Sequence, residues 1–186
     1  MKKILMWAVI AIFTLSLNTA DATAKDIPAG MRMEIAEDEE NNNTFSLFTY
    51  KDEDGVTAYY LSLGKEFKIS EIFEVEVLGG SISHIDEVCL CLGVTADEAI
   101  ASLNAILAIY DAEVNTIAEW PARMVSGSER LGKPTIINCV VKKKFIGGKY
   151  LQFNFVSGKH SAEADLGKST VKFLKKALEL DMKRHK

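Results

Sequence analysis

Residues 88–110, VCLCLGVTADEAIASLNAILAIY, join an apolar strand to an amphipathic helix, and the rest of the chain is interpreted outward from them. Alternate residues of a strand point to opposite faces, and here both faces are apolar, with Cys89 and Cys91 on one of them. A strand of this kind is expected in the interior of a sheet. Free cysteines behave as small hydrophobic residues at such positions, so we expect these thiols to belong to a core.

The helix that follows carries its own start signal. Thr95 and Glu98 have the spacing of a capping box, in which each side chain accepts a hydrogen bond from the other residue's backbone N–H. Apolar residues then recur at helical spacing and predict a helix over 95–111. They are Ala99, Ile100, Leu103, Ile106, Leu107 and Tyr110. A second predicted helix closes the chain, with an apolar stripe of Val171, Leu174 and Leu178.

Before residue 88, period-two alternation predicts antiparallel strands. Residues 44–51 and 56–63 form a hairpin whose three-residue loop, Glu53 to Gly55, has Gly55 in the left-handed conformation. One face, expected to be core, consists of Phe45, Leu47, Tyr59, Leu61 and Leu63. The other is an aromatic strip of Phe48, Tyr50, Ala58 and Tyr60. Another strand is predicted within residues 72–78.

After the first helix, residues 115–127 are expected to form an edge strand, because Pro121 has no N–H to donate to a ladder. Residues 134–145 and 149–158 form a second hairpin. A loop over residues 146–148 best separates the apolar from the polar face. The apolar face is then Ile137, Cys139, Val141, Phe145, Leu151, Phe153 and Phe155, with Lys143 as an exception beside the turn.

These elements predict one α+β domain. We expect a mostly antiparallel sheet of about 7–9 strands with two helices packed on one face, in the order strands, helix, strands, helix. Residues 25–43 hold a first strand and an acidic loop, and residues 44–186 form the single domain.

The N-terminus, MKKILMWAVIAIFTLSLNTADATA, is typical of a cleaved secretory signal over residues 1–24. Lys2 and Lys3 precede a short apolar run, and small residues with A-x-A spacing follow it. The run is shorter than the roughly 20 residues that a membrane span needs. We therefore expect a periplasmic or secreted protein that is soluble after cleavage and has no stable membrane span.

Charge is distributed unevenly along the chain. The net charge is −4, yet residues 25–100 hold 17 acidic and 5 basic side chains, whereas residues 101–186 hold 8 acidic and 15 basic. Two interpretations stay open: the halves neutralise each other across one sheet, or a charged partner binds one of them. The overall negative charge speaks against nucleic acid as a partner.

The cysteines and histidines form no recognisable motif. Cys89 and Cys91 have C-x-C spacing, whereas redox pairs have C-x-x-C spacing. The three cysteines and three histidines of the chain are scattered and do not make a zinc site. No cofactor or metal is therefore expected. If a disulfide forms, Cys139 is the natural partner of Cys89 or Cys91. His84 and Asp86 share a strand face and are interpreted as a surface pair, so we assign no catalytic residue.

The best functional hypothesis is an exported, non-enzymatic binding module for an unknown ligand or envelope protein. The candidate ligand-binding surface consists of Phe48, Tyr50, Tyr60, Lys142 and Lys144, which suit an anionic or sugar-like ligand. One alternative is a secreted hydrolase with a dispersed active site that includes His84, Asp86 and His160. Another is an inhibitor or assembly subunit whose acidic half meets a basic partner.

Overall fold

The protein has an α+β fold with an antiparallel sheet, as the sequence predicts. The computed structural model describes residues 27–64, 87–125, 131–157 and 160–185. The predicted signal, the strand expected within 72–78, and the pair His84 and Asp86 lie outside these residues. The elements are β1 (Arg32–Glu40), β2 (Asn43–Lys51), β3 (Thr57–Ser62), β4 (Glu87–Gly93), α1 (Ala96–Ile109), β5 (Ile117–Val125), β6 (Leu131–Lys143), β7 (Lys149–Ser157), β8 (His160–Gly167) and α2 (Lys168–Arg184).

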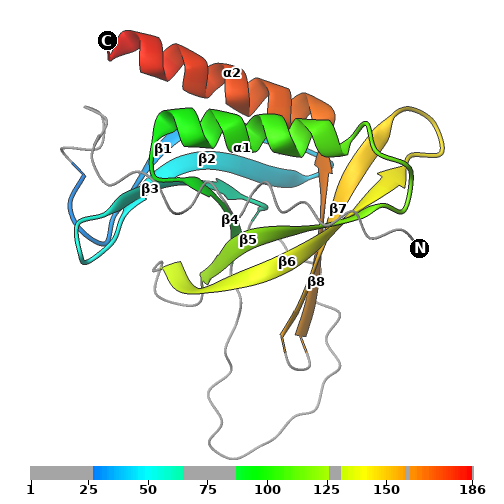
Figure 1. The fold of residues 1–186 in the computed structure, drawn as a ribbon, viewed down its shortest axis with the longest axis horizontal. Coiled ribbons are helices and arrows are strands. Elements are labelled where there is room, and N and C mark those ends of the chain that lie inside the picture. Colours follow the sequence, from blue (N-terminus) through cyan, green and yellow to red (C-terminus); the bar gives the residue numbers. More distant parts are fainter. Residues whose placement is uncertain (1–26, 65–86, 126–130, 158–159, 186) are drawn as a thin grey trace, which may run out of the picture.

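The eight described strands pair with their neighbours in sequence order, all antiparallel. The sheet curls into a half-barrel, and the two helices run side by side across it (Figure 1). Register shifts interrupt the ladders at Glu34/Ala36, Tyr59/Tyr60 and Arg123/Val125. An extra residue of this kind bends a strand and increases its twist, which is why such a sheet curls instead of lying flat.

The main core fills the concave side of the sheet. Leu103 and Ile106 of α1 and Leu174 and Leu178 of α2 are buried there with the inward residues of the strands. The face predicted as core, Phe45, Leu47, Tyr59, Leu61 and Leu63, belongs to this cluster. Helix α2 contacts α1, β1 and β8, so it lies between the two edges of the curled sheet.

The β2–β3 hairpin confirms its predicted register. The backbone N–H of Asp52 donates to the carbonyl of Val56 at 2.9 Å, and Gly55 has φ 81°. The predicted capping box of α1 is also present: Glu98 N–H donates to Thr95 Oγ1 at 3.2 Å, and the Glu98 carboxylate accepts from the N–H of Val94 and Thr95.

The acidic loop predicted after the first strand is wrong. Residues 37–40 belong to β1, and the turn to β2 consists only of Asn41 and Asn42, with φ 55° and 62°. Two successive residues with positive φ make a tight turn that suits the twist of a hairpin, and asparagine tolerates this conformation. The acidic side chains are therefore carried by a strand.

Strand β5 lies between β4 and β6, so the prediction that it is an edge strand is wrong. The β4–β5 ladder ends at Leu90↔Ala122, one position before Pro121 would have to pair. The carbonyl of Cys91 instead accepts a hydrogen bond from the indole Nε1 of Trp120 at 3.2 Å. A side chain thus replaces the N–H that proline lacks, and the strand can stay inside the sheet.

The β6–β7 hairpin has the predicted loop length, moved by one residue. Lys144 N–H donates to Gly148 O at 3.1 Å, so the loop is Phe145 to Gly147. Val141 and Leu151, both expected on the apolar face, are buried, and the shifted loop pairs them with each other. The prediction that Phe145 belongs to the core is wrong, because this residue lies at the tip and is fully exposed.

Candidate ligand-binding site

A second apolar cluster lies on the sheet face opposite the main core. It contains the buried residues Phe48, Tyr50, Tyr60, Cys89 and Val125, with Ala58, Cys91 and Leu131 packed against them. These residues come from β2 to β6, and in β2, β3 and β4 they alternate with side chains of the main core. The predicted aromatic strip is thus the start of this second cluster.

One end of the cluster is closed by a partly buried ion pair. The rings of Phe48 and Tyr60 are stacked at 5.7 Å between centroids, and the Arg32 guanidinium lies 4.6 Å from the Phe48 centroid. Arg32 donates to the buried carboxylate of Glu87 at 3.0 Å. Burial opposes the charge on Arg32, but the carboxylates of Glu87 and Glu34 outweigh it and raise the pKa of the guanidinium.

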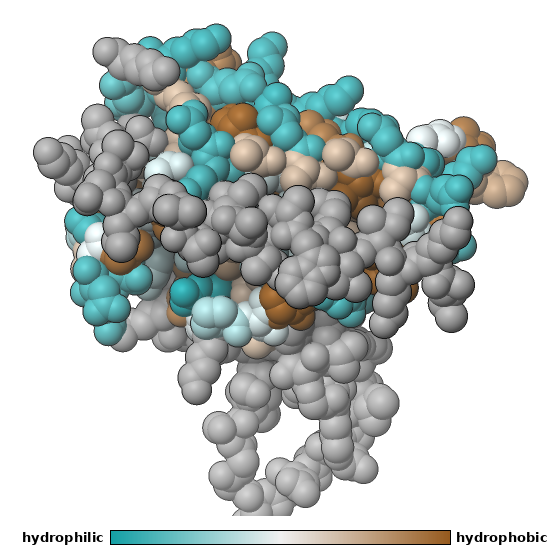
Figure 2. All heavy atoms as spheres, viewed as in Figure 1, coloured by the Kyte–Doolittle hydropathy of each residue, from teal (hydrophilic) through white to brown (hydrophobic). Residues whose placement is uncertain are grey.

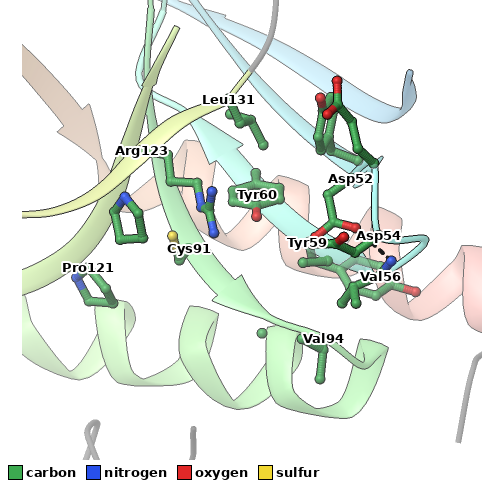
Figure 3. Close-up of a pocket in the computed structure, with 15 residues that line it drawn as sticks. Asp52, Asp54, Val56, Tyr59, Tyr60, Cys91, Val94, Pro121, Arg123 and Leu131 are labelled. Carbon is green, nitrogen blue, oxygen red and sulfur yellow. Dashed lines mark hydrogen bonds between the residues drawn. The ribbon is translucent and has the colours of Figure 1, made fainter. Parts of the chain in front are cut away.

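The other end opens into a pocket of about 730 Å³ (Figure 3). Its lining comes from the β2–β3 hairpin, from β4 and the residues after it, and from β5 and β6. Tyr60 and Arg123 lie beside each other on one side, and Asp52 and Asp54 of the hairpin loop lie on the other. The pocket therefore combines an aromatic wall, a cation and an acidic rim.

Arg123 is held in place within the pocket. Its Nη1 donates to the carbonyl of Gly132 at 3.1 Å, and its guanidinium lies close enough to the Cys91 thiol to oppose the rise in that thiol's pKa. Within the described residues it makes no ion pair with a carboxylate. An arginine held in this way presents its remaining N–H donors to a carboxylate or phosphate.

Cys91 and Tyr60 keep their protons at neutral pH. Burial raises the pKa of Cys91 to about 11, and Arg123 only partly opposes this effect. Burial also raises the pKa of Tyr60 to about 12, against the influence of Arg123. The thiolate is the reactive form of cysteine, so Cys91 is a poor nucleophile here, whereas the Tyr60 hydroxyl is available as a donor.

The five candidate surface residues from the sequence do not come together. Tyr50 and Tyr60 line the pocket, and Phe48 is buried beneath Arg32. Lys142 and Lys144 lie at the far end of β6, where Lys144 pairs with Glu40 at 3.2 Å. The pocket's cation is instead Arg123, which sequence reasoning missed. The one local hint in the sequence is that Arg123 lies two positions after Pro121 and therefore on the same face of the strand.

The three cysteines are free thiols on two sides of the sheet. Cys89 and Cys91 belong to the second cluster, whereas Cys139 is buried in the main core. Strand β5 also separates β4 from β6. The structure therefore does not bring together the cysteines of the disulfide considered from the sequence.

The described part of the chain contains no group of three or more His, Cys, Asp and Glu side chains that is suited to a metal ion. None of its helices has both the length and the apolar character to cross a membrane. Of the residues considered for a hydrolase, only His160 falls within it, at the start of β8. Comparison with protein-family models, curated proteins and solved structures finds no match to this chain.

Proposed function

We propose that the chain is an exported, non-enzymatic binding module and that its ligand occupies the pocket lined by Tyr60 and Arg123. The observation that carries the proposal is the pocket itself, with an aromatic wall and a positioned cation. Its volume of about 730 Å³ falls within the range of roughly 300–1,000 Å³ that is usual for small-molecule sites. Export rests on the N-terminal signal pattern.

The lining suggests the chemical class of the ligand. Tyr50 and Tyr60 suit a flat apolar or sugar-like body, which aromatic side chains bind through their faces. Arg123 suits a carboxylate or phosphate at one end of that body. Asp52 and Asp54 on the opposite rim suit amino or hydroxyl groups. We therefore expect a small polar ligand with an anionic group and a hydrogen-bonding end.

The same lining favours binding over catalysis. Among the described residues that line the pocket there is neither serine nor histidine, and the pKa of Cys91 is raised to about 11. Covalent catalysis needs a nucleophile within hydrogen-bond reach of a base, and these described residues offer no such pair. A pocket that orients a ligand without activating it is what a binding module requires.

Mass spectrometry of protein purified from its own host tests the proposal. Native spectra are expected to show a bound mass that is lost on denaturation. Arg123→Gln should weaken retention of that molecule about tenfold or more, because a charge-assisted hydrogen bond is lost. Lys176→Gln, on the exposed face of α2, should retain it fully.

Because Arg123 also donates to Gly132, Arg123→Lys serves as a second variant that keeps the charge but not the fork of donors. Its binding should lie between wild type and Arg123→Gln, with the thermal midpoint reported for each. Bare protein from the host would contradict the proposal, and so would a ligand retained equally by all variants.

A further inference from the structure

The tip of the β6–β7 hairpin displays two large apolar side chains in water. Phe145 is fully exposed and the adjacent Ile146 is 86% exposed. The tip projects at the right of the molecule, away from the sheet, and its surface there is apolar and bordered by hydrophilic residues (Figures 1 and 2). Neither side chain contributes to either apolar cluster. Their exposure therefore does nothing for the folded chain itself.

The hairpin holds these side chains in one place. The three-residue loop is closed by the hydrogen bond from Lys144 N–H to Gly148 O, and Gly147 has φ 117°. A Cβ at either Gly147 or Gly148 would meet no atom within 4 Å, so the tip is open on that side. A closed turn presents its side chains with little further loss of conformational entropy on docking.

Lysines surround the apolar tip. Residues 142–149 carry four lysines and no acidic residue. Lys149 donates to the carbonyl of Ala112, and Lys144 pairs with Glu40. Neither Lys142 nor Lys143 has an ion pair within the part of the chain that the structure describes, and Lys143 is exposed. These two side chains leave the tip with uncompensated positive charge.

The start of α2 extends the basic surface. Lys149, Lys168 and Lys172 all lie near enough to Asp111 to lower the pKa of its carboxyl, with Lys168 bonded to it at 2.9 Å. Glu40 and Asp111 are thus each engaged by a lysine, and Asp165 of β8 lies near Lys144. Lysines of the β6–β7 hairpin and of the first turns of α2 thus lie near the same acidic side chain.

We propose that the β6–β7 tip docks on an anionic lipid bilayer, with Phe145 and Ile146 entering the interface and Lys142 and Lys143 contacting anionic headgroups. Aromatic and aliphatic side chains at the level of the headgroups, ringed by lysines, are the chemistry of interfacial membrane binding. Each lysine near such a surface adds to its electrostatic attraction.

A lipid surface fits this tip better than a protein does. A specific protein interface buries roughly 800 Å² per partner, whereas two side chains on a narrow turn offer only a small fraction of that area. Lysine is also depleted in the centre of protein interfaces. A bilayer needs neither a large complementary area nor a fixed register. A small apolar tip surrounded by positive charge is therefore sufficient to bind it.

Vesicle flotation tests the proposal with the processed chain, purified from its host. We expect it to float with vesicles of mixed phosphatidylglycerol and phosphatidylcholine and not with phosphatidylcholine alone. The pair Phe145→Ser and Ile146→Ser should reduce binding about tenfold or more, as should the pair Lys142→Glu and Lys143→Glu. Leu180→Ser and Lys183→Glu on α2 make the same kinds of change elsewhere on the surface and should bind like wild type.

A fluorescence measurement locates the contact. Phe145→Trp should show a blue-shifted emission when anionic vesicles are added, whereas Leu180→Trp should not. Absence of vesicle binding at low salt would overturn the proposal. Vesicle binding that persists in both double variants of the hairpin, or an unshifted Phe145→Trp emission, would overturn it as well. So would double variants that lose binding to a protein partner but still bind vesicles.

Discussion

Through its side chain, Glu40 connects the β1 edge of the sheet to the start of α2. It ends β1, yet its carboxylate accepts a hydrogen bond from Thr170 Oγ1 at 2.9 Å and pairs with Lys144. It also lies against Gly167, the N-cap of α2, which has no side chain to cap the helix itself. A carboxylate at a helix N-terminus is favoured by the helix dipole. Glu40 of β1 therefore provides the negative charge that the first turn of α2 lacks.

Gly167→Ala should lower the free energy of unfolding by about 1–3 kcal/mol, because its Cβ would clash with the Glu40 carboxylate, which Thr170 and Lys144 hold in place. Urea denaturation measures the loss. Gly148→Ala, where a Cβ meets nothing, should stay within about 0.5 kcal/mol of wild type. In a Glu40→Ala background the Gly167→Ala penalty should shrink. An equal penalty in both backgrounds would show that this contact is not its cause.

At the scale of the element, α1 begins with a complete set of local contacts. Thr95 and Glu98 exchange hydrogen bonds, and Ser102 donates to the Leu92 carbonyl at 2.6 Å, which ties the helix to the end of β4. The helix start is therefore stabilised by residues close in sequence. For that reason the sequence alone was enough to place it.

Thr95→Ala should lower the free energy of unfolding by about 1 kcal/mol, since the N–H of Glu98 loses its acceptor. Chemical denaturation followed by circular dichroism measures the change. Ser169→Ala removes an exposed hydroxyl near the start of α2 and should shift stability by less than about 0.5 kcal/mol. Equal effects of the two substitutions would speak against the capping role of Thr95.

At the scale of the whole molecule, α2 connects parts of the chain that are far apart in sequence. It packs on β1, α1 and β8, and Val171, Leu174 and Leu178 are fully buried in the main core. Because this helix closes the curled sheet between its two edges, its core residues stabilise the sheet as well as the helix. Unfolding is thus expected to be cooperative.

Leu174→Ala should lower the free energy of unfolding by about 2–5 kcal/mol through loss of apolar burial and a residual cavity. Thermal unfolding should show one transition, with the same midpoint by far-UV and near-UV circular dichroism. Phe173→Ala, which truncates the 49% exposed neighbour, should have a much smaller effect. A separate early transition of α2, with the sheet intact, would contradict the closing role of this helix.

Local patterns predicted much of the fold. Alternation assigned the faces of β2, β3, β6 and β7, and the apolar character of both faces of Val88 to Leu92 marked β4 as interior. Strand β8 was missed, although Ala162, Ala164 and Leu166 alternate with Glu163 and Asp165 there. Gly55 predicted the β2–β3 loop, but the turn at Asn41 and Asn42 was obscured by the acidic residues before it.

The apolar face of most elements and the start of α1 follow from local patterns, because those properties depend on residues a few positions apart. The pocket shared by Tyr60 and Arg123, the contact of Glu40 with Gly167 and the interior place of β5 arise only when the chain folds. These contacts join residues between about 30 and 130 positions apart, and they form because curling the sheet around two helices buries the most apolar surface. No local pattern carries that information.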